Sequence, residues 1–149
     1  MYKFIVLMLL SFNLYAQQSV SVEYGVFTNH LDDNYDYNND NKMVAIEYNA
    51  NNWYFNVSTF DNSFYKRSYT IGSGYKIYSI YNLNFDVLWG ISTGYHATPA
   101  RLPIFGKIAL YVAPRVTYDL DLTDNVAVTP SVKMLGSAVE VGIGLKYKF

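Results

Sequence analysis

Residues Ser137 to Phe149 read SAVEVGIGLKYKF, and this stretch decides the fold. From Val139 to Phe149 an apolar residue occupies every second position. The positions between them hold only small or charged residues, such as Gly142 and Lys146. A period of two is typical of a β-strand whose two faces meet different surroundings.

The same alternation recurs along the chain and predicts eight strands. They lie at about 19–28, 42–50, 53–61, 67–79, 83–95, 105–118, 124–131 and 137–149. The spacers between them are rich in Asn, Asp, Gly and Pro, which favour turns. Because a transmembrane strand needs about 9–11 residues, eight of them fit a chain of 149 residues. We therefore predict an all-β fold, an eight-stranded antiparallel transmembrane β-barrel.

Two kinds of β-structure fit this pattern. In a soluble sandwich or lipocalin-like barrel the apolar face points inward, whereas in an outer-membrane barrel it points to lipid. Four features favour the membrane barrel, and one of them is the signal-peptide pattern of the first 16 residues. Nine of the 16 tyrosines recur near the ends of predicted strands, as aromatic girdles require: Tyr24, Tyr48, Tyr54, Tyr69, Tyr75, Tyr95, Tyr111, Tyr118 and Tyr147. A short turn at 50–52 alternates with a long loop at 29–41, and the last predicted strand ends in the aromatic Phe149.

The first residues, Met1 to Ala16, have the pattern of a cleavable signal peptide. Lys3 supplies a positive charge, Phe4 to Leu10 form an apolar run, and Ala16 is a small residue at the cleavage point. A buried N-terminal helix is the alternative. We expect 1–16 to be the signal peptide and 17–149 the barrel, secreted to the periplasm and inserted in the outer membrane of a Gram-negative-type cell.

Composition excludes several functional classes. The chain has no cysteine, so it has neither a disulfide framework nor a thiolate metal site. Its formal net charge is -1, without the basic stripe that nucleic-acid binding needs. The first long loop is acidic, but its spacing meets no firm metal-binding rule. We expect no nucleic-acid partner, no metal and no cofactor.

The inward face of the predicted barrel differs between its two ends. With the N-terminus in the periplasm, charged residues lie near the periplasmic end: Glu23, Glu47, Lys76, Asp86 and Lys146. They predict an ion-paired plug, because an unpaired buried charge is costly. Small and apolar residues lie nearer the outer end: Gly25, Phe27, Gly72, Gly74, Leu88, Gly90, Gly142 and Gly144. These glycines either permit barrel curvature or leave an outward-open slot suited to a hydrocarbon chain.

Two prolines fall inside predicted strands, Pro114 in the sixth and Pro130 in the seventh. Proline cannot donate a backbone hydrogen bond, so each weakens strand pairing. Weak pairing in a closed barrel predicts a lateral route from lipid to the lumen. A simple bulge or a loop boundary is the alternative.

One histidine and one serine form the candidate catalytic pair. His30 opens the first long loop, and Ser63 lies in the loop after the third predicted strand. Both loops face outside at the same rim of the predicted barrel. A histidine beside a hydroxyl can act as a general base for acyl transfer. The alternative is a solvated histidine in a polar loop.

The residues around Ser63 resemble the PagP family, the lipid A palmitoyltransferases of Gram-negative outer membranes. Phe60 to Lys66 read FDNSFYK and resemble the Phe-x-Asp-Ser-Phe-x-Lys motif of that family. The glycine-rich IGSGY at 71–75 follows at the family's distance, and Thr28-x-His30 matches its loop histidine. Residues 84–85 and 92–94 resemble its fifth strand, and Pro130 falls where the family has a strand-weakening proline. The resemblance covers about Thr28 to Phe149 in patches.

The resemblance implies a function and a site. Proteins of this family are eight-stranded barrels that move a palmitoyl chain from a phospholipid to lipid A, and we expect a monomer. The catalytic histidine and serine correspond to His30 and Ser63. The family's aspartate corresponds to Asn62, and either Asn62 or its neighbour Asp61 would orient His30. The family's hydrocarbon ruler corresponds to Gly74. The remaining glycines expected to line the acyl slot are Gly72, Gly90, Gly142 and Gly144.

Three other functions remain open at this point. The replacement of the family's aspartate by Asn62 motivates a catalytically inactive barrel that binds lipid. The polar first loop motivates a structural or adhesion barrel. A lipid A deacylase would use the same rim histidine.

Overall fold

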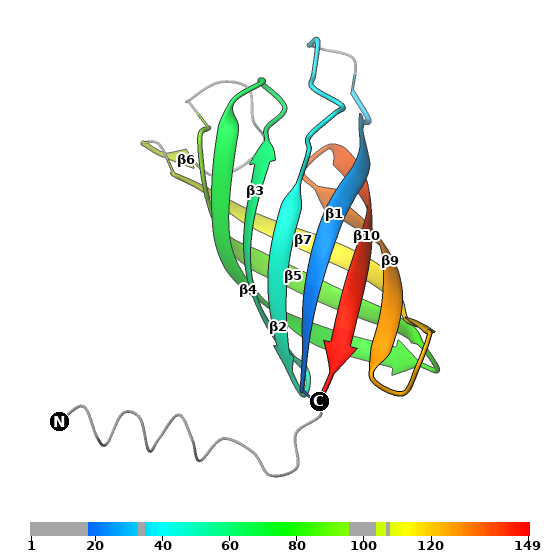
Figure 1. The fold of residues 1–149 in the computed structure, drawn as a ribbon. Helices are drawn as coiled ribbons and strands as arrows, with labels where there is room; N and C mark the ends of the chain where they lie inside the picture. The colour runs from blue at the N-terminus through cyan, green and yellow to red at the C-terminus, as the bar shows by residue number, and fades with distance from the viewer. Residues whose placement is uncertain (1–17, 33–34, 96–103, 107) are drawn as a thin grey trace, which may run out of the picture.

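The computed structural model describes residues 18–32, 35–95, 104–106 and 108–149. Over these residues it consists of β-strands and their connections (Figure 1). None of the described residues belongs to a helix long and apolar enough to cross a membrane. The expected signal peptide, residues 1–16, lies outside the described residues. The strands are β1 Gln18–His30, β2 Val44–Ala50, β3 Trp53–Asp61, β4 Arg67–Ile80, β5 Leu83–Thr93, β6 Ile104–Phe105, β7 Ile108–Tyr118, β8 Leu120–Asp121, β9 Val126–Leu135 and β10 Ala138–Lys148.

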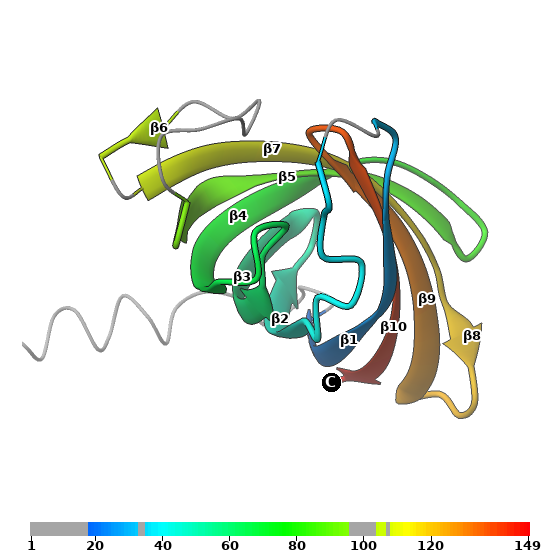
Figure 2. The same ribbon diagram turned by 90° about the horizontal axis from the view of Figure 1, so that it is seen from above.

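The eight long strands form a closed antiparallel barrel, which Figure 2 shows from above. Their order is β7, β5, β4, β3, β2, β1, β10 and β9, and β9 pairs with β7 to close the ring. The two-residue strands β6 and β8 pair with β7 and β9. The eight predicted strands correspond to the eight long strands, so the predicted fold class is confirmed.

The β7–β9 pairing that closes the barrel, here called the closing seam, is short, and a proline bounds each of its ends. β7 and β9 pair only over Arg115–Thr117 and Ser131–Lys133, whereas β5 and β7 pair along the whole of Leu83–Thr93. Pro114 precedes the paired stretch of β7, and Pro130 precedes that of β9. β9 nevertheless continues to Leu135, four residues beyond its predicted end, because β10 pairs with its full length. The lateral route at this seam stays a prediction.

The barrel has its apolar face outside. Along β7 exposed and buried side chains alternate without a break, and the buried ones include Tyr111, Ala113 and Arg115. The outward positions of that strand are Ile108, Leu110, Val112, Pro114, Val116 and Tyr118. On the long strands described by the structure, Arg67 at the start of β4 is the one charged residue that is exposed on the outer face. Apart from the Asp61–Arg67 pair at the loop end, the inside therefore holds the charged groups and the outside holds the apolar ones.

A β-bulge in β1 overturns one inward expectation. The pairing of β1 with β10 shifts between Gly25 and Phe27. As a result, two successive side chains point outward, and Val26 and Phe27 are 59% and 51% exposed. The inward series resumes at Thr28, which is buried. Phe27 was expected inside because strict alternation has no place for the extra residue of a bulge.

The two ends of the barrel differ in their connections (Figure 1). At one end, here called the turn end, β2 joins β3 and β4 joins β5 through two-residue turns at 51–52 and 81–82. At the other end, here called the loop end, 13 residues at 31–43 join β1 to β2, and 62–66 join β3 to β4. Outer-membrane barrels combine short periplasmic turns with longer external loops.

Arg115 on β7 organises the middle of the lumen. It donates two hydrogen bonds to the carboxylate of Glu47, at 2.8 and 3.2 Å, and one to Asp86 at 3.1 Å. Its guanidinium also lies 4.9 Å from the centre of the Tyr54 ring, whose hydroxyl donates to Asp86 at 2.9 Å. The predicted ion-paired plug is therefore present, but its central cation is Arg115 rather than Lys76 or Lys146.

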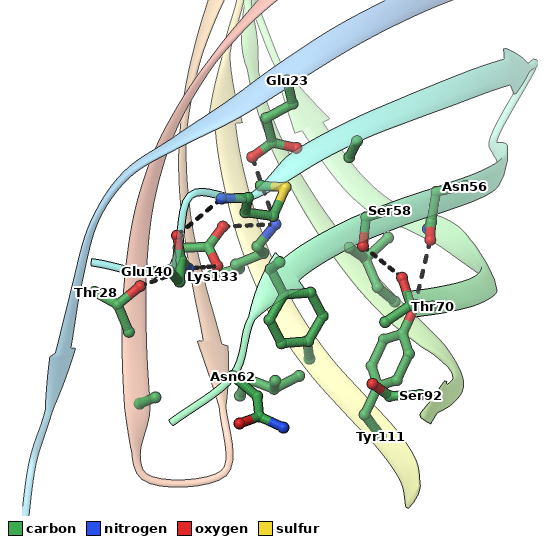
Figure 3. Close-up of a pocket in the computed structure, with 18 of the residues that line it drawn as sticks. Glu23, Thr28, Asn56, Ser58, Asn62, Thr70, Ser92, Tyr111, Lys133 and Glu140 are labelled. Carbon is green, nitrogen blue, oxygen red and sulfur yellow. Dashed lines mark hydrogen bonds and ion pairs between the residues drawn. The ribbon is translucent and has the colours of Figure 1, made fainter. Parts of the chain in front are cut away.

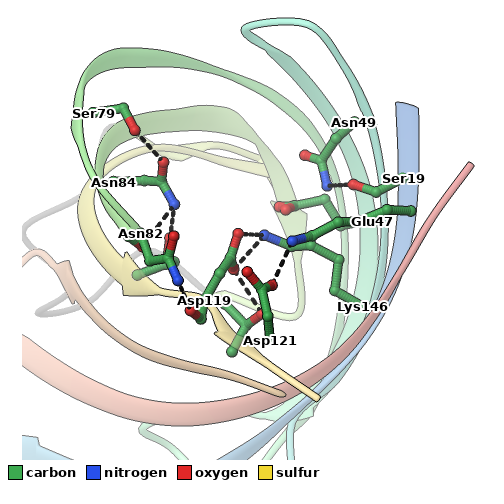
Figure 4. Close-up of polar contacts among 12 residues, drawn as sticks. Ser19, Glu47, Asn49, Ser79, Asn82, Asn84, Asp119, Asp121 and Lys146 are labelled. Atoms are coloured by element: carbon green, nitrogen blue, oxygen red, sulfur yellow. Dashed lines mark hydrogen bonds and ion pairs between the residues drawn. The ribbon is translucent and has the colours of Figure 1, made fainter. Parts of the chain in front are cut away.

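A group of polar side chains lies at the turn end, on the periplasmic side of the ion-paired plug in the predicted orientation (Figure 4). Lys146 pairs with Asp119 at 2.6 Å, and Lys148 pairs with Asp121 at 2.5 Å. Asn82 donates to the backbone oxygen of Asp119 at 2.7 Å. These contacts tie the 119–125 turn to β10 and to the β4–β5 turn, so they brace this end of the barrel.

Candidate active site

His30, Ser63 and Asn39 form a hydrogen-bonded chain at the loop end. The Nε2 atom of His30 lies 2.8 Å from the Oγ atom of Ser63. Its Nδ1 atom lies 3.0 Å from the Oδ1 atom of Asn39. Tyr37 stacks on the imidazole ring, with 4.1 Å between ring centres and an angle of 12°. The histidine is therefore held on three sides, by one hydroxyl, one amide and one aromatic ring.

This contact pattern selects one tautomer of the neutral imidazole. An amide oxygen can only accept a hydrogen bond, so the contact with Asn39 places the proton of neutral His30 on Nδ1. Nε2 is then free to accept the hydrogen of the Ser63 hydroxyl. This is the tautomer that a general base needs in order to activate a serine.

Asn38 brings the two loops of the site together. Its buried side chain donates to the backbone oxygens of Asp61 and Asn62, at 3.2 and 3.3 Å. Its backbone nitrogen donates to the oxygen of Ser63 at 3.0 Å. The first loop is thereby fixed against the turn that carries Ser63, and Asn39 follows directly beside His30.

Asn62 holds the Ser63 turn in shape and does not contact His30. Its Oδ1 atom accepts from the backbone nitrogens of Phe64 and Lys66, at 2.9 and 3.1 Å. Its Nδ2 atom donates to Ser68 Oγ at 3.0 Å and to the oxygen of Gly94 at 3.1 Å. The side chain is 1% exposed. Asn62 therefore provides hydrogen-bond partners, from inside the barrel, for the backbone groups of the tight turn that carries Ser63.

Asp61 also has a partner other than His30. Its carboxylate pairs with Arg67 across the β3–β4 hairpin, at 3.3 Å. Of the four residues expected at the catalytic centre, the structure thus brings together His30 and Ser63. The orienting contact expected from Asn62 or Asp61 is made by Asn39.

A cavity of about 80 Å³ lies in the lumen beneath Ser63, and Figure 3 shows part of its lining. Ser63 and Asn62 border it at the rim. Apolar walls come from two buried clusters, one containing Met43, Phe60 and Tyr95 and the other containing Leu88, Tyr111 and Ala113. Charged side chains also border it, namely Glu23, Glu47, Arg115 and Lys133 on the side of the plug and Glu140 nearer the loop end.

The five glycines expected to bind the acyl chain do not line this cavity. Side chains or backbone of neighbouring strands occupy the space beside four of them. A Cβ atom on Gly74 would overlap the Leu88 side chain, and one on Gly72 would overlap the Tyr111 hydroxyl. One on Gly90 would lie 2.6 Å from the backbone of Gly72. These glycines thus let larger side chains cross the lumen.

The other two glycines lie on β10. A Cβ atom on Gly142 would lie 2.5 Å from the carboxylate of Glu23, so that glycine makes room for the ionic cluster. At Gly144 the nearest atoms would lie 3.5 Å away, which is ordinary van der Waals contact.

Tyr95 closes one side of the cavity and stays protonated over a wide pH range. It is 4% exposed and packs edge to face against Phe64, with 6.4 Å between ring centres. Burial raises the pKa of Tyr95 to about 12, and the negative charge of Glu140 adds to the effect. Tyr95 and Phe64 therefore form an uncharged aromatic wall on one side of the cavity.

Several residues that build the site were not among those predicted. Asn39 and Tyr37 lie in a loop, where no periodicity indicates which side chain will face His30. Arg115 carried a usable signal, because the alternation of β7 places position 115 inside the barrel. Within the residues that the structure describes, no three His, Cys, Asp or Glu side chains are grouped as metal ligands would be.

Comparisons with known proteins support the fold alone. No protein-family profile and no curated protein matches this sequence. Among solved structures, the chain is similar to the outer membrane protein Ail of Yersinia pestis, with a TM-score of 0.53 and 14% identity over 90% of this chain and 99% of that one. It is also similar to a de novo designed transmembrane β-barrel, with a TM-score of 0.51 and 16% identity over 89% of this chain and 95% of that one. The chain has the fold of eight-stranded transmembrane barrels.

Proposed function

We propose that this protein is an outer-membrane β-barrel that transfers acyl groups at its external rim. The observation that carries the proposal is the chain of contacts from Ser63 through His30 to Asn39, with distances of 2.8 and 3.0 Å. A nucleophile, a base and a group that orients the base are the parts that serine-based acyl transfer needs.

The outer surface supports the membrane location. The outward positions of the described long strands are apolar or aromatic, apart from a few uncharged polar side chains and the Asp61–Arg67 ion pair at the loop end. Exposed aromatic residues gather toward the turn end, among them Trp53, Tyr75, Tyr81, Phe85 and Tyr118. Such a surface is costly in water and favourable in lipid. With the turn end in the periplasm, the site faces the outside of the cell.

The reaction proposed for the site has two steps. His30 Nε2 takes the proton of the Ser63 hydroxyl, and Oγ forms a bond to the carbonyl carbon of an ester donor. The donor's alkoxide leaves with the proton that His30 carries. An acceptor hydroxyl then loses its proton to His30 and attacks the acyl-serine, which releases Ser63 with its proton restored. Asn39 keeps the Nδ1 proton in place throughout.

The resemblance to the PagP family supports the choice of substrates. It implies a phospholipid as donor and a hydroxyl of lipid A as acceptor. Both lipids would meet the rim of a barrel in the outer membrane. The same residues, His30 and Ser63, carry the resemblance and make the 2.8 Å contact.

Mass spectrometry of lipid A tests the proposal. The chain and its His30→Ala and Ser63→Ala variants would be expressed in a Gram-negative host that lacks its own palmitoyltransferase. We expect lipid A to gain an acyl group with the native chain and to lose that gain with either variant. Since general-base catalysis contributes roughly 10²–10⁴-fold, the His30→Ala variant should fall below detection. The Asn29→Ala variant serves as control, because Asn29 precedes His30 and is exposed.

A structural barrel is the second candidate, and the ion-paired middle of the lumen favours it. Arg115, Tyr54 and three carboxylates occupy the middle of the barrel, as expected of a protein whose interior serves stability. An unchanged lipid A profile, with the barrel shown to be folded in the outer membrane, would favour this candidate. Loss of an acyl group in place of gain would identify a deacylase.

A further inference from the structure

We infer that the site takes short acyl groups, of about four carbons or fewer, and excludes a palmitoyl chain from the lumen. This inference rests on the proposed function, because it concerns the acyl group that Ser63 would carry. It replaces the long-chain phospholipid donor that the PagP resemblance implies with an ester of a short acid. Its basis is the size and shape of the cavity beneath Ser63 and the side chains that end it.

The volume of the cavity sets the limit on chain length. Ser63 borders the cavity, so an acyl group on its Oγ atom would extend downward between the two apolar walls. The cavity has about 80 Å³. An engineered apolar cavity of about 150 Å³ binds benzene, so about half that volume fits three or four carbons. A palmitoyl chain is several times longer.

Two side chains end the cavity on the β4–β5–β7 side, and both are buried. Leu88 is 5% exposed and lies over Gly74, so the position expected to act as a ruler is already covered. Tyr111 is 8% exposed and lies over Gly72 and Gly90.

Charged groups end the cavity in its depth. Lys133 pairs with Glu140 at 2.9 Å and lies 3.6 Å from Glu23, and Arg115 lies 3.9 Å from the same Glu23. A longer acyl chain would have to displace these pairs and leave buried charges without partners. That cost is far greater than the gain of burying a few methylene groups.

Ester hydrolysis by the purified full barrel tests the inference. The probes are the p-nitrophenyl esters of acetate, butyrate, octanoate and palmitate in one detergent, with the rate of the Ser63→Ala variant subtracted. We expect kcat/KM for acetate or butyrate to exceed that for octanoate and palmitate at least tenfold. The Leu88→Ala variant should open the space over Gly74 and shift the preference toward octanoate. Leu110→Ala is the matched control, because Leu110 lies on the outer face of β7.

The possible results separate the two proposals. A preference for palmitate over butyrate that depends on Ser63 would overturn the short-chain inference and leave the acyl-transfer proposal standing. An unchanged chain-length preference in a folded Leu88→Ala barrel would also overturn it. No Ser63-dependent turnover of any ester would overturn both. If the Leu88→Ala variant does not fold, the chain-length preference of the native barrel tests the short-chain inference by itself.

Discussion

The two halves of the lumen differ in how their polar groups are used. In the half toward the turn end, Arg115 binds Glu47 and Asp86 in one cluster, and Lys146 binds Asp119. In the half toward the loop end, a cavity remains, and His30 and Ser63 contact each other at its rim. An interior crossed by ion pairs gives stability, and the hollow of about 160 Å³ left at the turn end is lined mainly by polar and charged side chains. The cavity at the loop end has apolar walls beside a base and a hydroxyl, so it leaves room for an acyl substrate. The comparison therefore assigns stability to one half and chemistry to the other.

Removal of Arg115 tests this assignment most severely. Arg115→Met should lower the free energy of unfolding by about 3–5 kcal/mol, because it leaves buried carboxylates without their cation. Urea unfolding of the refolded barrel in detergent micelles measures the change. Adding Glu47→Gln to the same chain should restore part of the loss. Lys148→Met is the control, since its partner Asp121 is 45% exposed and such pairs contribute about 1 kcal/mol or less.

Asn62 tests whether the loop-end half also contains a purely structural residue. Asn62→Asp would restore the aspartate of the PagP motif. It would also lose the hydrogen bonds donated to Ser68 and Gly94 and bury a charge. We expect a loss of about 2–3 kcal/mol in the free energy of unfolding and no gain in activity. Increased lipid A acylation by a folded Asn62→Asp barrel would contradict the structural role.

Asn39 provides the opposite case, a residue whose loss should affect chemistry alone. Asn39 is exposed and contacts His30 Nδ1. Asn39→Ala should reduce the turnover of a short ester roughly tenfold, equivalent to about 1.4 kcal/mol, and leave urea unfolding unchanged. Asn39→Asp keeps an oxygen acceptor at the same place and should retain most activity. Equal rates for the alanine variant and the native barrel would show that Asn39 does not orient the base.

The smallest effect at neutral pH is expected from Tyr95→Phe in the aromatic wall of the cavity. Below about pH 10 the folded and unfolded states both keep the phenol proton, so the native barrel and the variant should differ little. Above about pH 10 the Tyr95 phenol ionises first in the unfolded state, because its pKa in the folded barrel is raised to about 12. The native barrel should lose stability relative to Tyr95→Phe between about pH 10 and 12. Parallel urea unfolding curves at these pH values measure the difference, with Tyr65→Phe as the exposed control.

The sequence alone was sufficient for the strands and for the face on which most residues lie. The period of two is a local property of each strand, and it predicted the eight segments and the inward positions of Glu23, Glu47 and Asp86. It also placed His30 and Ser63 at the same rim, because two strands that run in the same direction end on the same side of a barrel. Alternation fails only where a residue is added, as at Phe27 beside the bulge.

The contacts inside the lumen and between the loops depended on the tertiary structure. Arg115 and Glu47 lie 68 residues apart in the chain, and only barrel closure brings them to 2.8 Å. Asn39 takes the place expected for Asn62 because the buried Asn38 fixes one loop against the other. The size of the cavity depends on how far Leu88 and Tyr111 reach across the lumen. Strand order, loop packing and the room left between side chains are properties of the closed barrel, and no single segment contains them.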